Sequence, residues 1–565
     1  MWAALISLVM RFRVWLCASV WVTACGDSGR SSASDASFSG SASATTGGTS
    51  ATGEVPTGSG EATAATGTLS ATGTGSDTGF KYDLGAPDDS EGSTGPAPPL
   101  CKVDGEDAPV PCVEKAPPDS FAAEVQWAWE DDLQPGNRCG LTPLVANFTD
   151  DNGDGEIDLC DTPDILTVVS DGPGSGHLIL FDGATGTVHW RNAEFVSWAT
   201  TPAVGDFDGD GVVEFVASDP VGTVMAYEND GTIKWTSMAA KVPYGAAMGL
   251  ADLDADGDVE IYGGRLILDH TGALLHTLDD EEWLYPATAA ADLDGDGDLE
   301  VVLGSRAFHH DGTMYYDNPE VGLGYPQIAD LDADGLPEVL VTGSNGFSIL
   351  EHDGASKPGA LGLQPTGDSA GELFWRRPAT IHDFDGDGLP EFAQSSAQHY
   401  SVFEPNPVSI VWSADVLDGS GIAAGTAFDF LGDGIAEAMY ADETTFFAFD
   451  GAGSPLMTAP RLSGTMIEYP TVADVDNDGA AEVVVVSYST MEPSTGYPCI
   501  QVLRDAEERW VGARRIYNQH TYHVTNVRED GSIPQQEPRH WEQLNTFRTQ
   551  AQLEGGSACK PPPPG

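Results

Sequence analysis

Asp292-Leu293-Asp294-Gly295-Asp296-Gly297-Asp298-Leu299-Glu300 contains the pattern that best predicts the fold. Carboxylates occupy positions 1, 3 and 5, a glycine occupies position 6, and a further carboxylate closes the stretch at position 9. Calcium binds roughly six to eight oxygens, and a tight turn at the glycine lets short side chains converge on one ion. An EF-hand closes its ring at position 12 and continues into a helix, whereas an apolar run, 301–303, follows here at once. The stretch therefore predicts a calcium site in a loop between two strands.

One such loop would be weak evidence, because turns rich in Asp and Gly are common without metal. This chain has eight in the same register, about 40 to 55 residues apart, and a repeat of that length with strand-like flanks is typical of a propeller or solenoid. The eight loops begin at Asp150, Asp206, Asp252, Asp292, Asp330, Asp383, Asp429 and Asp474.

The predicted calcium ligands are the side chains at positions 1, 3, 5 and 9 of seven loops. They are Asp150, Asn152, Asp154 and Asp158; Asp206, Asp208, Asp210 and Glu214; Asp252, Asp254, Asp256 and Glu260; Asp292, Asp294, Asp296 and Glu300; Asp330, Asp332, Asp334 and Glu338; Asp383, Asp385, Asp387 and Glu391; and Asp474, Asp476, Asp478 and Glu482. The eighth loop has Leu431 at position 3, so we expect its site to be weak or empty. The sequence thus predicts about seven Ca²⁺ sites.

Residues 201–235 show the repeat unit most clearly. Apolar runs separated by turn signals divide it into four short strands, which is the blade of a β-propeller. The predicted fold class is all-β, a propeller of about eight blades, with seven open if one unit is split or lies outside the ring. A strand-like segment at 125–129 precedes the first unit, and we predict that it completes the last blade and closes the ring.

This pattern resembles the FG-GAP/VCBS repeat family, the propeller module of integrin alpha subunits and of many bacterial surface proteins. The resemblance covers about 120–515 and depends on the eight acidic loops and on the Pro-x-apolar entry before several of them. It implies a propeller with calcium in hairpin loops on one face. It also implies binding or adhesion more often than catalysis.

The first 24 residues resemble a lipoprotein-type export signal. Arg11 and Arg13 precede an apolar run, 14–24, which is too short to span a bilayer as an ordinary helix. The run ends in Ala24-Cys25-Gly26, which resembles a bacterial lipobox and implies lipidation of Cys25; a plain secretory signal is the alternative. We therefore expect an exported protein, lipid-anchored at the bacterial cell envelope or outer surface, or secreted.

Composition divides the rest of the chain. Residues 25–100 are mostly Ser, Thr, Gly, Ala and Pro, so they bury too little apolar surface to fold and are predicted to be a disordered linker. A cysteine-containing lead-in at 101–120, the propeller at 121–515 and a C-terminal packing segment at 516–565 are predicted to follow. The formal net charge is −64, so we expect no nucleic-acid partner, and membrane association only through a lipid anchor.

Six of the eight cysteines remain after Cys17 leaves with the signal and Cys25 is lipidated. An even set in an exported chain favours disulfides, and six cysteines allow about 15 pairings. We expect neighbours to pair, as Cys101–Cys112, Cys139–Cys160 and Cys499–Cys559.

The segments that lead into the first strand of each blade should meet around one mouth, on the face opposite the acidic loops. Aromatic rings with arginines there suit sugar stacking or peptide capture, and packing between blades is the alternative. The candidate residues are Trp198, Tyr244, Trp283, Tyr285, Tyr325, Arg376, Arg377 and Tyr469.

The sequence favours a non-catalytic binding, adhesion or scaffold module for a glycan or protein. The first alternative is an extracellular polysaccharide lyase on a calcium-rich propeller, for which Arg376 and Arg377 suit uronates but no base is identified. A quinone-dependent dehydrogenase relative is a weaker alternative, because its tryptophan-docking repeat occurs in good form once, at 181–190. The tail histidines His520, His523 and His540 are interpreted as structural, with a transition-metal site as the alternative.

Overall fold

The computed structural model describes residues 101, 110–131, 138–172, 174–280, 284–364, 375–419, 422–489, 496–554 and 557–561. The predictions on the export signal, Cys25, the linker and Trp283 lie outside these residues. The fold described here is that of the unit formed by residues 81–565. Within the described residues, no helix has the length and apolar character needed to cross a membrane.

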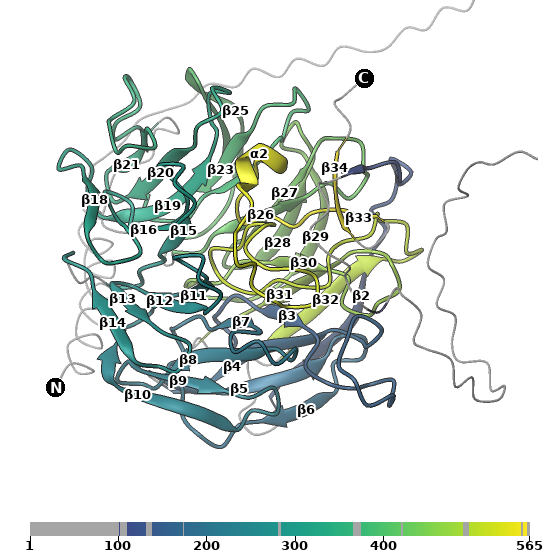
Figure 1. The fold of residues 1–565 in the computed structure, drawn as a ribbon. Coiled ribbons are helices and arrows are strands. Elements are labelled where there is room, and N and C mark those ends of the chain that lie inside the picture. The colour runs from purple at the N-terminus through teal and green to yellow at the C-terminus, as the bar shows by residue number, and fades with distance from the viewer. Residues whose placement is uncertain are drawn as a thin grey trace, which may run out of the picture. The chain divides into compact units, whose positions relative to one another are not determined.

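Eight small antiparallel sheets form the blades of a propeller, numbered here in chain order (Figure 1). Blades 1 to 4 have four strands each. They consist of β3 (Leu144–Ala146), β4 (Asp164–Gly172), β5 (Ser175–Asp182) and β6 (Val188–Arg191); β7 (Ala203–Gly205), β8 (Glu214–Ser218), β9 (Thr223–Tyr227) and β10 (Ile233–Lys241); β11 (Met248–Ala251), β12 (Glu260–Gly263), β13 (Leu266–Leu268) and β14 (Leu274–Thr277); and β15 (Ala289–Ala291), β16 (Glu300–Val302), β17 (Arg306–Phe308) and β18 (Met314–Asp317).

The remaining blades repeat the plan, except that blade 5 has three strands within the described residues. They consist of β19 (Gly324–Ala329), β20 (Glu338–Gly343) and β21 (Gly346–Leu350); β22 (Thr380–His382), β23 (Glu391–Ser395), β24 (His399–Pro405) and β25 (Val408–Asp415); β26 (Gly425–Phe428), β27 (Glu437–Ala441), β28 (Thr445–Phe449) and β29 (Pro455–Pro460); and β30 (Thr471–Ala473), β31 (Glu482–Val486), β32 (Ile500–Asp505) and β2 (Ala123–Trp129). The all-β propeller is confirmed, and the number of blades is eight rather than seven.

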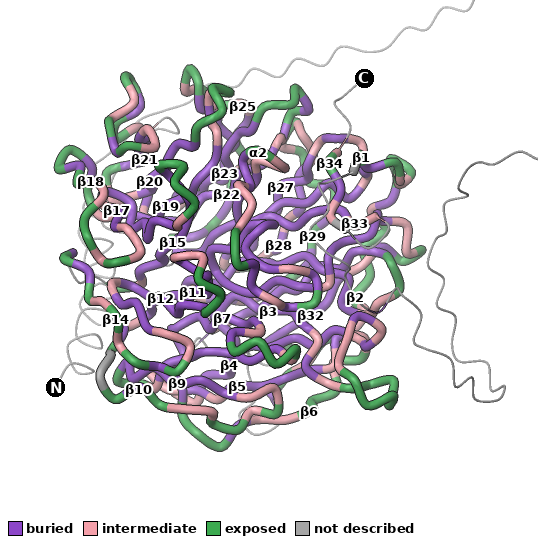
Figure 2. The backbone as a smooth tube through the Cα atoms, in the orientation of Figure 1, coloured by how far each residue is buried: buried purple, intermediate pink, exposed green. Residues whose placement is uncertain are grey.

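The first strand of each blade is fully buried, whereas the fourth strands alternate between covered and exposed residues (Figure 2). This pattern follows from the position of each strand, because inner strands are covered on both faces by neighbouring blades. The core therefore runs between the blades, and short apolar runs such as β31 are sufficient to build it.

The predicted closing strand is confirmed. β2 pairs antiparallel with β32, so the N-terminal part of the propeller supplies the fourth strand of blade 8. Trp127 of β2 then packs against blade 1, where its Nε1 donates to the Gly183 carbonyl at 2.6 Å. Gly186 lies beneath the indole at φ +69°, and a Cβ there would come within 2.4 Å of the ring. The glycine is thus required both by its backbone conformation and by the close approach of the tryptophan.

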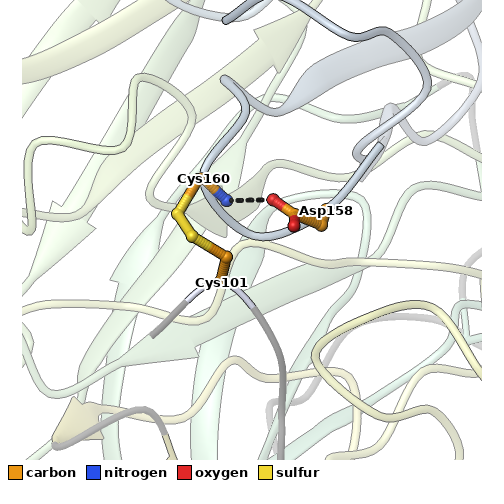
Figure 3. A group of neighbouring side chains, drawn as sticks. All are labelled: Cys101, Asp158 and Cys160. Atoms are coloured by element: carbon orange, nitrogen blue, oxygen red, sulfur yellow. Dashed lines mark hydrogen bonds between the residues drawn. A yellow bond between two sulfur atoms is a disulfide. The ribbon is translucent and has the colours of Figure 1, made fainter. Parts of the chain in front are cut away.

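The three disulfides are Cys101–Cys160, Cys112–Cys559 and Cys139–Cys499 (Figure 3 shows the first). The prediction that six cysteines form disulfides is confirmed, but all three predicted pairings are wrong. Closure of the ring brings the two ends of the propeller together, so Cys112–Cys559 and Cys139–Cys499 join residues far apart in the sequence, whereas Cys101–Cys160 spans a separation of 59 residues. The short strand β1 (Val110–Pro111) pairs in parallel with β34 (Ser557–Lys560), which also pairs with β33 (Leu553–Glu554).

Residues 514–552, the axial segment, lie at the centre of the ring (yellow in Figure 1) and contain the short helix α2 (His540–Gln543). This segment is hydrogen-bonded to residues in or beside the first strand of every blade. The partners, in blade order, are Val145–Tyr517, Val204–Asn518, Leu250–Gln519, Thr288–Thr521, Ile328–His540, Ile381–Phe547, Thr426–Arg548 and Val472–Gln550. The axial segment therefore fills the channel that a ring of blades would otherwise leave open.

Candidate functional site

The acidic loops share one backbone conformation, which the aspartate at position 1 stabilises. In the loop of blade 2, Asp206 accepts hydrogen bonds from the Gly209 amide at 2.8 Å and the Gly211 amide at 3.0 Å. Gly211, at position 6, has φ +90°, a conformation that side chains disfavour. In blade 6 the amides of Gly386 and Gly388 donate to Asp383 in the same way, and in blade 8 the amides of Asp478 and Gly479 donate to Asp474. This curl brings positions 1, 3 and 5 to one side of the loop, as a cation site requires.

The closing glutamate is the first residue of the second strand in blades 2 to 8 and is buried in each. One of its oxygens accepts the amide hydrogen of the residue at position 2, as in the 2.8 Å bond from Phe384 to Glu391. The second oxygen of Glu391, and that of Glu482, is buried and has no hydrogen-bond partner in the described part of the chain. Buried carboxylate oxygens of this kind fit a bound cation, because an ion would supply the missing partner.

Electrostatics in the loops also fit a cation. Burial, together with the charge of nearby loop aspartates, raises the pKa of the Glu391 carboxyl to about 9 and that of Glu260 to about 8. Burial likewise raises the pKa of Asp383 and Asp252 to about 6. A divalent ion would offset this concentration of buried negative charge.

Two loops contain a lysine that the sequence analysis did not connect with them. Lys234 Nζ lies 2.6 Å from Asp208 and 2.8 Å from Glu214, the carboxylates at positions 3 and 9 of the loop of blade 2. In blade 5, Lys357 Nζ lies 2.7 Å from Asp332 and 2.8 Å from Glu338. Both lysines follow the third strand of their blade. A lysine at this position in the sequence of a repeat could therefore have predicted an ion pair with the acidic loop. An ammonium group here would compete with calcium for the same oxygens.

The loop of blade 1 differs from the other seven. The amide of Asp151, at position 2, donates to Asp161 at 3.0 Å, and the Asn152 amide donates to the same oxygen. The predicted closing residue, Asp158, instead accepts from the Cys160 amide at 3.0 Å, beside the Cys101–Cys160 disulfide (Figure 3). Asp161 stands at position 12 counted from Asp150, which is the closing position of an EF-hand. Sequence reasoning missed this residue by imposing the nine-residue spacing of the other loops.

Four aromatic rings form a continuous arc on the face opposite the acidic loops. They lie there because they precede first strands or follow second strands, whereas the acidic loops join first strands to second strands. Trp198 stacks on Tyr488 with ring centroids 4.7 Å apart, and Tyr244 lies 6.4 Å from Trp198 and 5.6 Å from Tyr285. We call these four residues the aromatic arc. Arg376 extends it, since its Nη2 donates to the Leu284 carbonyl at 3.2 Å. Tyr488 was not predicted, because it follows β31 rather than preceding a first strand.

Trp198 of the arc is itself buried and its three tyrosines are half-buried, and three other predicted mouth residues are buried as well. Tyr469 donates to the His520 carbonyl of the axial segment at 2.5 Å, and Tyr325 is fully covered near the same segment. Arg377 donates to the Asp418 carbonyl at 2.6 Å, and both of these side chains are buried. The structure therefore brings Trp198, Tyr244 and Tyr285 together and separates Tyr325, Arg377 and Tyr469 from the exposed surface.

Comparisons with known proteins agree with this fold. A family model for an FG-GAP-like repeat matches residues 330–394. Among solved structures, the V. cholerae biofilm matrix protein Bap1 is similar, with 20% sequence identity over 77% of this chain and 99% of that chain and a TM-score of 0.65. A search of curated proteins finds no match.

Lower similarity is found to rhamnogalacturonan lyases. The exotype lyase YesX has 15% identity over 81% of this chain and 83% of its own, with a TM-score of 0.46. A Bacillus licheniformis rhamnogalacturonan lyase has 17% identity over 80% of this chain and 83% of its own, with a TM-score of 0.42. The chain thus contains an FG-GAP-like repeat and forms an eight-blade propeller.

Proposed function

We propose that this FG-GAP-repeat propeller is a calcium-binding recognition module outside the cytosol, and that its aromatic arc binds a glycan or a protein. The arc carries the proposal, because four rings from separate segments gather on one face. Phe195 and Leu284, from the segments that carry Trp198 and Tyr285, are each 53% exposed, so apolar surface is available for a ligand. The three disulfides agree with an exported protein, and fold similarity to a biofilm matrix protein supports a binding role.

The charge of the chain narrows the class of ligand. A formal net charge of −64 repels polyanions such as uronic-acid polymers and nucleic acid. Aromatic rings bind the apolar faces of sugars, and they also bind neutral or cationic peptide side chains. Neither contact requires a charged group on the propeller. We therefore propose a neutral glycan as the first ligand class and a neutral or basic protein segment as the second.

Calcium is proposed as the ion of the acidic loops. Blades 3, 4, 6 and 8 supply four carboxylates each at the predicted positions, and blade 1 supplies Asp150, Asn152, Asp154 and Asp161. The unpartnered oxygens of Glu391 and Glu482 support occupancy of blades 6 and 8 most directly. In blades 2 and 5 the ion would have to displace Lys234 or Lys357 from the same carboxylates. Isothermal titration of chelator-treated protein should therefore show strong sites and, in addition, weaker ones.

The lyase alternative has less support from the geometry. A lyase would need cationic groups such as Arg376 and Arg377 to bind uronates, but Arg377 is buried against Asp418. Our proposal therefore assigns binding rather than turnover to this face. Ultraviolet absorbance of unsaturated products, formed from pectic substrates in calcium buffer, would favour the lyase instead.

The binding test uses a glycan array with the exported chain in calcium buffer. The double variant Tyr244→Ala, Tyr488→Ala removes two faces of the aromatic arc and should weaken binding at least about tenfold, since each ring contact contributes on the order of 1 kcal/mol. Tyr315→Ala is the matched control, because this half-buried tyrosine lies on the outer strand β18. Unchanged binding by the double variant would assign the ligand to another surface and reject the proposal.

We further propose that Cys25 is lipidated and that the linker holds the propeller away from the membrane. The lipobox-like ending at Ala24-Cys25-Gly26 motivates this. A Cys25→Ser protein should leave the membrane fraction and appear in the soluble or secreted fraction. If it fractionates with membranes as the wild type does, the anchor is not at Cys25.

A further inference from the structure

Three side chains of the axial segment, none of them part of an acidic loop, converge on one another. His523 Nε2 lies 2.5 Å from a Glu537 oxygen, and the rings of His523 and His540 have centroids 4.4 Å apart. One donor atom from each of the three residues lies within 4.8 Å of the others. His523 and His540 are both buried. Two imidazoles and a carboxylate at this separation match the ligand number and type of a mononuclear transition-metal site.

The remaining ring nitrogens are held by backbone carbonyls. His523 Nδ1 lies 3.1 Å from the Thr521 carbonyl, and His540 Nε2 lies 2.8 Å from the Ile328 carbonyl. Because a carbonyl oxygen only accepts, each of these nitrogens must carry the hydrogen. In the neutral rings the lone pairs are then on His523 Nε2 and His540 Nδ1. Metal-binding histidines are typically fixed in this way, with the outer nitrogen donating to a carbonyl or carboxylate.

His540 provides a second, independent observation. Its side chain is fully covered, and its Nδ1 has no hydrogen-bond partner in the part of the chain that the structure describes. A single proton between His523 and Glu537 would satisfy that pair but would leave His540 Nδ1 without a partner. A metal ion would satisfy all three donors at once. Thr525 Oγ1 also donates to Glu537 at 3.1 Å, which orients the carboxylate.

We propose that His523 Nε2, Glu537 and His540 Nδ1 form a site for one divalent transition-metal ion of the zinc class. Nitrogen ligands favour zinc and related ions over calcium, which prefers oxygen. In tetrahedral geometry the 2.5 Å separation of His523 and Glu537 would open to about 3.3 Å, and one position would remain for water. Phe547 stacks on His523 and Trp541 packs against His540, so the walls are largely apolar.

The ion would connect separate parts of the axial segment. His523 precedes the turn at 524–527, whereas Glu537 and His540 come after the long excursion that contacts blades 2 and 3. Through the Ile328 carbonyl, His540 also connects the site to β19 of blade 5. The proposed role is thus to fix the axial segment in its channel, independently of calcium in the loops.

The test uses the full exported chain in millimolar calcium, which occupies the oxygen sites. After treatment with dipicolinate and gel filtration, the protein is titrated with zinc chloride, and bound metal is measured by elemental analysis. We expect one tightly bound zinc per chain. Glu537→Gln and His540→Gln should each lower zinc affinity by at least about 100-fold, whereas His276→Gln, a partly exposed histidine on β14, should leave it unchanged.

Cobalt provides a readout that requires no variant. Co²⁺ added to the stripped wild type should produce the visible absorption of a four- or five-coordinate ion with nitrogen ligands, and zinc should abolish it. The proposal is overturned if the wild type takes up neither ion in calcium buffer. It is also overturned if Glu537→Gln or His540→Gln binds zinc as tightly as the wild type.

Discussion

Replacing Glu391 with glutamine should change the stability of the protein differently with and without calcium. The Glu391 side chain is buried, one oxygen accepts the Phe384 amide hydrogen at 2.8 Å, and the other has no hydrogen-bond partner in the described residues. Glutamine has the same shape and keeps an acceptor for that amide, but it carries no charge. In calcium the change removes a ligand of the proposed ion. In chelator the Glu391 carboxyl, whose pKa burial raises to about 9, is protonated near neutral pH, so the change replaces one neutral buried group with another.

The expected magnitudes follow from mass action. An ion present at about 100 times its dissociation constant stabilises the folded state by about 2.7 kcal/mol. Since the variant should lose most of this binding, Glu391→Gln should lower the free energy of unfolding by about 2–3 kcal/mol in millimolar calcium. In EDTA the same change should alter the free energy of unfolding by less than about 1 kcal/mol, because the protonated carboxyl and the amide are both neutral and both bury a polar group that lacks a partner. Urea unfolding in the two buffers measures both values.

Glu338→Gln is the matched control. Its carboxylate lies 2.8 Å from Lys357 Nζ, so glutamine there would remove one of the carboxylates that compensate this lysine in either buffer. We expect this control to destabilise the protein with and without calcium. Equal destabilisation by Glu391→Gln in calcium and in EDTA would refute the reasoning, because the effect would then owe nothing to a bound ion.

Four further changes test other parts of the structure. Without calcium, Lys357→Met should lower the free energy of unfolding by about 3 kcal/mol, because Asp332 and Glu338 lose their cation; calcium should reduce this loss in urea unfolding. Trp127→Ala should cost about 3 kcal/mol in the same assay, since the indole packs β2 against Gly186 of blade 1. Replacing Cys112 and Cys559 together with serine should cost about 3–5 kcal/mol, because this disulfide joins residues 447 apart in the sequence. Burial, together with the charge of Arg548, holds the pKa of His520 well below its usual 6.5. The unfolded chain therefore binds a proton below pH 6.5 that the folded chain does not, and stability falls as pH falls. Between pH 6.5 and 5.5, urea unfolding should show that the wild type loses about 1 kcal/mol more than His520→Asn does.

The ring of blades could be predicted from the sequence because each acidic loop marks one hairpin. The loop fixes where a first strand ends and a second begins, so eight loops define eight blades. The strand at 125–129 could also be assigned to the last blade, because it has no partner strand next to it in the sequence. Disulfide pairing could not, since Cys112 and Cys559 meet only after β2 has closed the ring and β34 has paired with β1. Nearness in sequence carried no information about those contacts.

The candidate site was only partly predictable, because the axial segment has neither strand periodicity nor a repeated motif. Its occupation of the channel explains why Tyr325 and Tyr469 are fully covered although they stand at entry positions like that of Tyr244, which is half-buried. Residues near the axis contact the segment, as the 2.5 Å bond from Tyr469 to the His520 carbonyl shows. Farther from the axis, Tyr244, Tyr285 and Tyr488 stay half-buried and, with the buried Trp198, form the aromatic arc.

The axial segment also links the two proposed cation systems. Arg539 Nη2 donates to Asp292 of the blade 4 loop at 2.8 Å, and the next residue, His540, belongs to the proposed zinc site. Each blade in addition offers the segment a hydrogen bond in or beside its first strand, and the acidic loop follows that strand. Loss of calcium should therefore loosen the loops and the seat of the axial segment together. Loss of zinc should release the segment while the blades keep their calcium, so hydrogen exchange after selective removal of each ion should separate the two effects. Faster exchange at 514–552, with the first strands unchanged, would identify the loss of zinc. Faster exchange in the acidic loops and in the axial segment alike would identify the loss of calcium.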